Sequence, residues 1–192
     1  MERAARIVVC LMLITVPTWA QNTAPKEPDR FQAFHFFLGA WEGEGQGQPG
    51  KSRVSREYAL VLDGRFIEVR NHSVYAPQEG NSGEDHRDIG FISFDSARGK
   101  HVLRQFHVEG FVNQYVHEST SDDGKTLTFV TEAIENIPAG WRARETYILP
   151  GPDELVERFE LAEPGKDFEL YTENRLRRVA LGGSESRSYE RE

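Results

Sequence analysis

The feature that most limits how this chain can fold is a regular alternation of strand-like segments and turn residues from Gly39 onward. Each segment is rich in β-branched and aromatic residues, and Gly, Asp, Asn or Pro follows it, at a spacing of roughly ten residues. The predicted strands cover approximately residues 39–46, 52–62, 65–75, 88–94, 101–108, 111–118, 126–132, 141–149, 154–161 and 168–179. This pattern predicts an all-β domain.

The short connections predict that neighbouring strands pair antiparallel in an up-and-down order. An open sheet of this size would leave two unpaired edges, and closure into a barrel removes them. We therefore expect an antiparallel β-barrel of about ten strands, lipocalin-like in form, with a sandwich as the alternative. The one longer connection, residues 76–87, is expected to be a rim or lid.

The two ends of the chain differ from this pattern. Charged residues precede an apolar run at residues 7–16, and Ala20 closes it, as in a cleaved secretory signal peptide. Phe31, Phe34 and Phe37 recur at helical spacing after Asp29, which predicts a short helix that plugs or covers the barrel. The chain thus divides into a signal peptide (1–20), a flexible leader (21–30), a β-barrel domain (31–179) and a disordered tail (180–192). Export predicts a periplasmic or secreted protein.

Composition narrows the possible partners. Cys10 is the only cysteine and lies in the predicted signal peptide, so the mature chain has no disulfide, cysteine metal site or cysteine nucleophile. The formal net charge of −8 disfavours nucleic acid and anionic membranes. The apolar run is too short to span a membrane, so we expect no membrane span. The partner that we expect is a small molecule.

The first predicted strand has an unusual face. Gly39, Trp41, Gly43, Gly45 and Gly47 alternate with polar residues, so they share one side of the strand. Acidic residues and another strand follow, which excludes a phosphate-binding loop. A bare glycine face marks either close approach by another backbone, which barrel curvature would require, or a ligand.

The hairpin around Glu109-Gly110 can be assigned a register. If those two residues form the turn, the side richer in large residues carries Arg104, Phe106, Asn113, Tyr115 and His117, and we expect it to face inward. A buried Arg104 would need an acidic partner, either an acidic group on the ligand or an internal acid. The candidate internal acids are Glu68, Glu145 and Glu157.

These inward positions have two interpretations: a self-satisfied polar network that fixes the register, or a pocket with a few convergent polar groups. The predicted ligand-binding residues are Trp41, Arg70, His72, Arg104, Phe106, Asn113, Tyr115, His117 and Glu145. No histidines form an HxH or HxxxH pair, and no serine lies in a nucleophile elbow, so no metal ligands and no catalytic residues are assigned. His86 is expected in the exposed loop and His35 in the leader helix.

The opening Phe37-Leu38-Gly39-Ala40-Trp41-Glu42-Gly43-Glu44-Gly45 resembles the G-x-W-x-G-x-G first strand of nitrobindin-like domains, and especially that of their uncharacterised exported bacterial members. The resemblance extends to the strand count and to the ending Asn174-Arg175-Leu176-Arg177-Arg178. It implies a calycin-type barrel and haem bound by a histidine on a strand near the C-terminus. The corresponding strand here, residues 168–176, contains no histidine, which leaves His117 or Tyr171 as the candidate axial ligand.

The favoured hypothesis is an exported barrel that holds a small, partly apolar ligand, with an acidic group on that ligand as one of the two candidate partners of Arg104. A haem variant with His117 or Tyr171 is the alternative within this class. A second class is a barrel enzyme in which Arg104, His117 and Glu145 act as acid and base. A third possibility is a solidly packed barrel that acts only through its surface.

Overall fold

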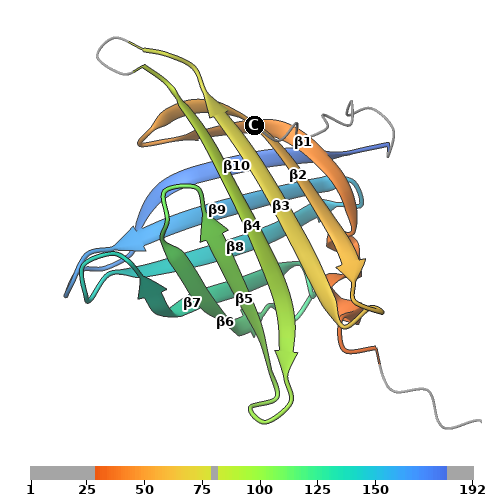
Figure 1. The fold of residues 1–192 in the computed structure, drawn as a ribbon. Helices are drawn as coiled ribbons and strands as arrows, with labels where there is room; N and C mark the ends of the chain where they lie inside the picture. Colours follow the sequence, from red (N-terminus) through yellow and green to blue (C-terminus); the bar gives the residue numbers. More distant parts are fainter. Residues whose placement is uncertain (1–28, 79–81, 181–192) are drawn as a thin grey trace, which may run out of the picture.

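A computed structural model describes residues 29–78 and 82–180, and in it ten strands close into one antiparallel barrel (Figure 1). A short 3-10 helix, η1 (Gln32–Phe37), precedes the strands. The strands are β1 (Gly39–Gly47), β2 (Gly50–Val61), β3 (Phe66–Tyr75), β4 (Glu84–Asp95), β5 (Lys100–His107), β6 (Val112–Thr120), β7 (Thr126–Glu135), β8 (Arg142–Gly151), β9 (Glu154–Ala162) and β10 (Glu169–Val179). Each strand pairs with its neighbours in sequence, and β1 pairs with β10. The predicted ten-stranded up-and-down barrel is confirmed, and the sandwich alternative is wrong.

The predicted signal peptide lies outside the described residues, as does almost all of the predicted leader and tail. Among the described residues, no helix has the length and apolar character needed to cross a membrane.

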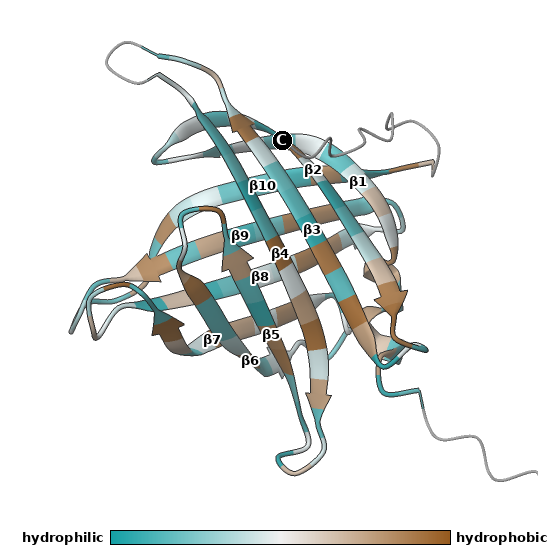
Figure 2. Cartoon of the chain, viewed as in Figure 1, coloured by the Kyte–Doolittle hydropathy of each residue, from teal (hydrophilic) through white to brown (hydrophobic). Residues whose placement is uncertain are grey.

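Alternation along the strands builds the core. Hydrophilic and hydrophobic residues follow one another along β3 and β4 (Figure 2), and the burial pattern alternates in the same way, as on β2 from Ser52 to Tyr58. Side chains on successive residues point to opposite faces of a strand, so one set fills the barrel. The largest fully buried side chains are Trp41, Tyr115, Phe34, Phe37 and Phe129.

The helix η1 closes one end of the barrel. Phe34 and Phe37 are almost completely buried, and the Phe37 ring lies 5.2 Å from Tyr58 and 5.3 Å from Tyr147. The predicted short helix is therefore present, in 3-10 form, because six residues are too few for a stable α-helix. We call this end of the barrel the plugged end.

Trp41 and Arg178 fasten the plug to the closing seam of the barrel. The Trp41 indole Nε1 donates a hydrogen bond of 2.7 Å to the Phe37 carbonyl, and Trp41 is fully buried. The Arg178 guanidinium lies 4.2 Å from the Trp41 ring centre and donates to the Phe36 carbonyl at 2.6 Å. The carbonyls at the end of η1 are thus satisfied by side chains of β1 and β10.

The glycine face of β1 is explained by close packing against β10. A Cβ atom added to Gly43 or Gly47 would collide with the backbone carbonyl of Arg175 or Tyr171. At Gly45 it would collide with the side chains of Asn174 and Ser52. The observed cause is close approach by another strand at the barrel seam, the first of the two predicted explanations.

The β5–β6 hairpin corrects the predicted register by one residue. Phe106 pairs with Val112 and Arg104 with Gln114, so residues 108–111 form the turn. The difference arises because the Val108 amide still bonds to the Arg87 carbonyl at 2.9 Å, which extends the β4–β5 ladder past His107. A slip of one residue reverses every side chain of a strand, so Leu103, Gln105 and His107 face inward in place of Arg104 and Phe106.

Candidate functional site

The end of the barrel opposite η1 is bounded by residues 48–49, 76–78, 82–83, 108–111, 136–141 and 163–168, and we call it the mouth. Beneath the mouth, the interior holds a buried ion pair between Arg56 of β2 and Glu157 of β9, whose side chains are 5% and 3% exposed. The contact is bidentate, with Nη2 to Oε2 at 2.8 Å. Alternation places Arg56 inside, in phase with the buried Val54 and Tyr58.

Amide side chains extend this ion pair around the barrel wall. The Asn71 Oδ1 of β3 accepts from Arg56 at 3.0 Å, and Asn71 Nδ2 donates to Asp88 Oδ2 of β4 at 2.9 Å. On the other side, Asn174 Nδ2 of β10 donates to Glu157 Oε2 at 2.7 Å. The network therefore runs from β10 to β4 and positions Asp88 toward the mouth.

Glu145 of β8 is a second buried acid next to Glu157. Burial raises the pKa of Glu145 well above its usual range, and the charge of Glu157 raises it further. A raised carboxyl pKa means that Glu145 is held in its neutral form, able to donate as well as accept a hydrogen bond. The positive charge of Arg56 would favour the ionised form of Glu145, but Arg56 is already paired with Glu157.

Several buried polar atoms in this half of the barrel have no hydrogen-bond partner within the described chain. They are Asp88 Oδ1, Gln105 Oε1, His107 Nδ1 and Glu145 Oε2, among others. An unpaired buried polar group costs about 1–3 kcal/mol, so native proteins normally pair such groups with protein, water or ligand. These inward polar atoms of β4, β5 and β8 can therefore still form hydrogen bonds with water or with a bound molecule.

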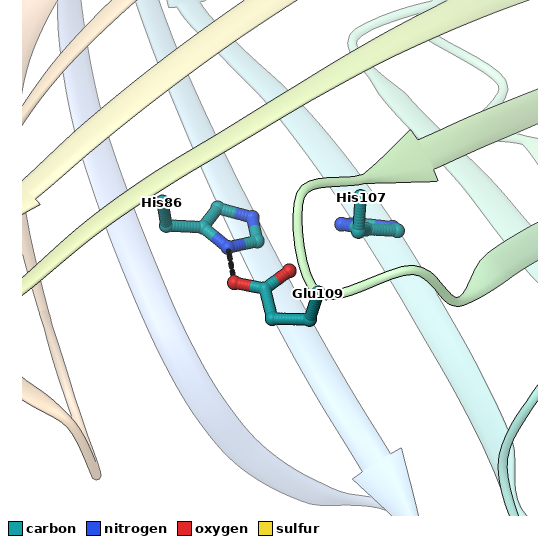
Figure 3. Close-up of side chains that lie close together, drawn as sticks. All are labelled: His86, His107 and Glu109. Carbon is teal, nitrogen blue, oxygen red and sulfur yellow. Dashed lines mark hydrogen bonds and ion pairs between the residues drawn. The ribbon is translucent and has the colours of Figure 1, made fainter.

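Two histidines stand at the rim of this region (Figure 3). Burial alone would lower the pKa of His86, but its hydrogen bonds with Asp88 and Glu109 raise that pKa to about 9. Burial lowers the pKa of His107 below its ordinary value. At neutral pH the rim therefore carries one charged and one neutral imidazole.

An irregularity in β10 brings Tyr171 to the mouth. The pairing with β9 shifts between Leu170 and Thr172, so Tyr171 is an extra residue in the strand and lies 5.8 Å from the Phe159 ring. Burial raises the pKa of Tyr171, as do the nearby charges of Glu84 and Glu109. The bulge explains how a residue that is out of phase with its neighbours reaches the rim.

Four of the predicted site residues lie on the outside of the barrel, and their predicted inward orientation is wrong. Arg70 contacts Glu68, itself wrongly predicted to be internal, and His72 contacts Asp85. Arg104 donates to Gln114 and Phe106 is 49% exposed, both as a result of the register described above. The inward face of these strands was predicted from the size of the side chains. Side-chain size does not by itself determine which face of a strand points inward.

The other five predicted residues point inward but divide between the two ends. Asn113, Tyr115 and Glu145 are buried, and Asn113 Nδ2 donates to the Tyr115 hydroxyl at 2.9 Å. Trp41 and His117 lie at the plugged end, where His117 packs 5.3 Å from the Phe129 ring. The proposed acid–base set of Arg104, His117 and Glu145 is therefore not assembled.

The residues that the sequence did not single out are Arg56, Asn71, His86, Asp88, Gln105 and His107. His86 was expected in an exposed loop, whereas it belongs to β4 and its side chain is only 20% exposed. Arg56 could have been found from its position in the strand, because it lies two residues from both Val54 and Tyr58 and therefore shares their inward face. The others come together only through the register of β3, β4 and β5.

Comparison with known families gives one decisive match: residues 30–178 match the THAP4-like, heme-binding beta-barrel domain. The chain belongs to this family. The nitrobindin-like resemblance predicted from the first strand is thereby confirmed. A search of curated proteins gives no match.

One solved structure supports the fold of this THAP4-like domain. The crystal structure of Rv2717c from M. tuberculosis is 20% identical, with a TM-score of 0.61, over 82% of this chain and 99% of that one. A de novo designed fluorescence-activating β-barrel is 16% identical, with a TM-score of 0.41, over 75% of this chain and 94% of that one. At these identities the first shows a shared fold.

The residues of this THAP4-like domain do not match a haem site with a histidine on the last strand. The inward residues of β10 are Thr172, Asn174 and Leu176, none of which is a histidine. Of the two candidate axial ligands, His117 is packed under the plug with its Nε2 2.9 Å from Thr120 Oγ1, while Tyr171 is at the mouth. No haem ligation is derived from these positions.

Proposed function

We propose that this protein is an exported binding protein that holds a small molecule in the mouth half of the barrel. The observation that carries the proposal is the set of buried, unpaired polar atoms on β4, β5 and β8. Convergent polar groups among apolar walls are the general form of a small-molecule site. Membership of a barrel family described as heme-binding supports ligand binding as the general role.

The charges of the interior indicate the chemistry of the ligand. An acidic ligand was expected because Arg104 was placed inside, but Arg104 lies outside and the buried Arg56 is neutralised by Glu157. Asp88 and Gln105 offer oxygen atoms that are unpaired within the described chain and that accept hydrogen bonds. We therefore propose a neutral or cationic ligand with N–H or O–H groups, in contact with the Phe159 and Tyr171 rings.

Export is the second part of the proposal. It rests on the sequence of residues 1–20, in which charged residues, an apolar run and Ala20 follow in the order of a signal peptide. The expected location is the periplasm or the exterior. Mass spectrometry of the protein from its host should give an N-terminus near Gln21, and an intact N-terminus would contradict export.

Native mass spectrometry of protein purified from its own host tests ligand binding. We expect a retained small molecule that is lost or strongly reduced in Gln105→Leu, which removes an unpaired inward oxygen. The matched control is Gln114→Leu on the outer face of the neighbouring strand, which should keep the molecule. A wild-type protein that carries nothing and gains no thermal stability from any member of a metabolite panel would favour the solidly packed barrel.

A further inference from the structure

Three side chains at the mouth lie in the arrangement of a metal site. His86, His107 and Glu109 offer ligand atoms that all lie within 4.8 Å of one another. The Nδ1 of His86 is 2.8 Å from Glu109 Oε1, and the His107 ring lies on the other side of the Glu109 carboxylate (Figure 3). We propose that His86, His107 and Glu109 bind one divalent transition-metal ion, with zinc as the expected ion.

The strand register explains how the two histidines meet. His107 is the cross-strand partner of Asp88, and His86 lies two residues before Asp88 on the same inner face of β4. Side chains diagonal to each other across an antiparallel pair are within reach when they are long or aromatic. The His86 and His107 ring centres are 5.4 Å apart.

The β5–β6 turn presents Glu109 between the two rings (Figure 3) and is itself held in place. The Gly110 amide donates to the His107 carbonyl at 2.8 Å, and the positive φ of Gly110 allows the tight turn. From the adjacent end of β7, Asn136 Nδ2 donates to the Gly110 carbonyl at 2.8 Å. A ligand on a fixed turn loses little conformational freedom when it binds an ion.

Groups behind the three ligands are placed to orient them. Asp88 Oδ2 lies 3.5 Å from His86 Nε2, so Asp88 can hold that nitrogen while Nδ1 faces the ion, as carboxylates do behind metal-bound histidines. The Asn113 side-chain amide lies 3.3 Å from His107 Nε2, and with its oxygen turned to that nitrogen it would accept from Nε2–H and leave Nδ1 for the ion. The His107 ring stacks 4.1 Å from Phe111. Both imidazoles therefore have one nitrogen engaged and one directed toward Glu109 or left free.

An ordinary ion pair does not account for the whole cluster. The contact between His86 and Glu109 would explain those two residues, yet within the described part of the chain His107 Nδ1 remains buried and unpaired. The Oδ1 of Asp88, whose side chain is 4% exposed, also has no partner among the residues that the structure describes. A bound ion would use His107 Nδ1 as a ligand. The Asp88 carboxylate would then hold the His86 ring from behind.

The chemistry of the ligands selects the ion. Two imidazole nitrogens and one carboxylate are the ligand set of open zinc sites, in which a fourth position is left for water or another small molecule. Harder ions such as calcium and magnesium prefer all-oxygen ligands, which this cluster lacks. The fourth position would face the mouth, where it is accessible to whatever enters the barrel.

Isothermal titration of the chain, free of any affinity tag and of bound metal, with zinc chloride tests the site. We expect one ion per chain. His107→Ala and Glu109→Gln should each weaken binding about 100-fold, and Asp88→Asn about 10-fold to 100-fold. Titration with cobalt(II) should give the visible absorption bands of a four-coordinate or five-coordinate site, and His107→Ala and Glu109→Gln should weaken these bands most.

His72→Ala is the matched control, because His72 is a β3 histidine paired with Asp85 on the outer face. It should leave the zinc affinity unchanged. The proposal fails if the wild type shows no saturable binding, if Glu109→Gln and His107→Ala both bind as tightly as the wild type, or if His72→Ala weakens binding equally. Since Glu109 lies in an exposed turn, Glu109→Gln decides the question even if His107→Ala fails to fold.

Discussion

The two ends of this barrel are built on opposite principles. At the plugged end, Phe34, Phe37 and Trp41 are buried, and the one indole N–H has its hydrogen-bond partner. At the mouth, Asp88, Gln105 and His107 keep buried polar atoms that have no partner among residues 29–78 and 82–180. The plugged end thus supplies stability, while the mouth retains unsatisfied hydrogen-bonding groups, which is typical of sites that give up stability for binding.

Three of the histidines show a related contrast. Burial against aromatic rings lowers the pKa of His101 and His117 at the plugged end. At the mouth, contacts with Asp88 and Glu109 outweigh burial and raise the pKa of His86. His101 and His117 are thus held neutral and His86 is held charged, because two acids lie beside His86.

The largest expected effect is a loss of stability from a substitution at the plugged end. Trp41→Ala should lower the free energy of unfolding by about 3–5 kcal/mol, because it leaves a cavity and removes the anchor for the Phe37 carbonyl and Arg178. Urea denaturation followed by circular dichroism measures the change. Phe106→Ala, at a 49% exposed site, is the control and should change stability by about 0.5 kcal/mol or less. Equal effects would contradict the assignment of the core.

The next effect disrupts the network beneath the mouth. Arg56→Met should cost about 3 kcal/mol, because it leaves Glu157 buried without its cation. The double variant Arg56→Met/Glu157→Leu should recover much of that loss, since an apolar pair can replace a buried ion pair. Urea denaturation of Arg56→Met and of the double variant measures how much stability is recovered. A double variant no more stable than Arg56→Met would contradict the prediction.

A smaller effect of opposite sign is expected at Glu145. Its folded-state pKa is raised, so its contribution is most favourable below the unfolded pKa and is lost as pH rises toward the folded pKa. Glu145→Gln, which removes the titrating group, should therefore stabilise the protein by about 1 kcal/mol or more at pH 8 and by less at pH 5. Thermal unfolding across this range measures the difference, and a gain that does not grow with pH would refute the assignment.

The smallest effect concerns His101 under the plug. Because burial lowers its pKa, the folded state binds fewer protons, and stability is lost as pH falls below the ordinary histidine pKa of about 6.5. His101→Phe should reduce the loss of thermal stability between pH 7 and pH 5, by less than about 1 kcal/mol because the ring is only half-buried. An unchanged pH slope would show that His101 does not carry this dependence.

The sequence was sufficient for the architecture because strand alternation and turn residues are local signals. It located ten strands and the short plugging helix, both of which the structure contains. It failed at the β5–β6 hairpin, where Glu109-Gly110 has the composition of a two-residue turn but the Val108–Arg87 bond lengthens it. Long-range pairing of this kind leaves no local trace in the sequence.

The candidate site was largely beyond the reach of sequence patterns. Arg56 could have been placed inside from its phase with Val54 and Tyr58, but its charge argued against burial. His86, His107 and Glu109 come from two strands and a turn, and His86 is 21 residues before His107, so no ligand spacing connects all three. Their proximity follows from the register of β4 with β5, which only the folded chain defines.

The glycine face of β1 has a consequence for how such a barrel can change its ligand. Gly43, Gly45 and Gly47 have no room for a side chain, so this sector of the wall cannot be altered without moving β10. New specificities must instead arise on the strands across the barrel, from β4 to β8. A mutant library aimed at new ligands should leave β1 unchanged and vary Gln105, Asn113 and Glu145.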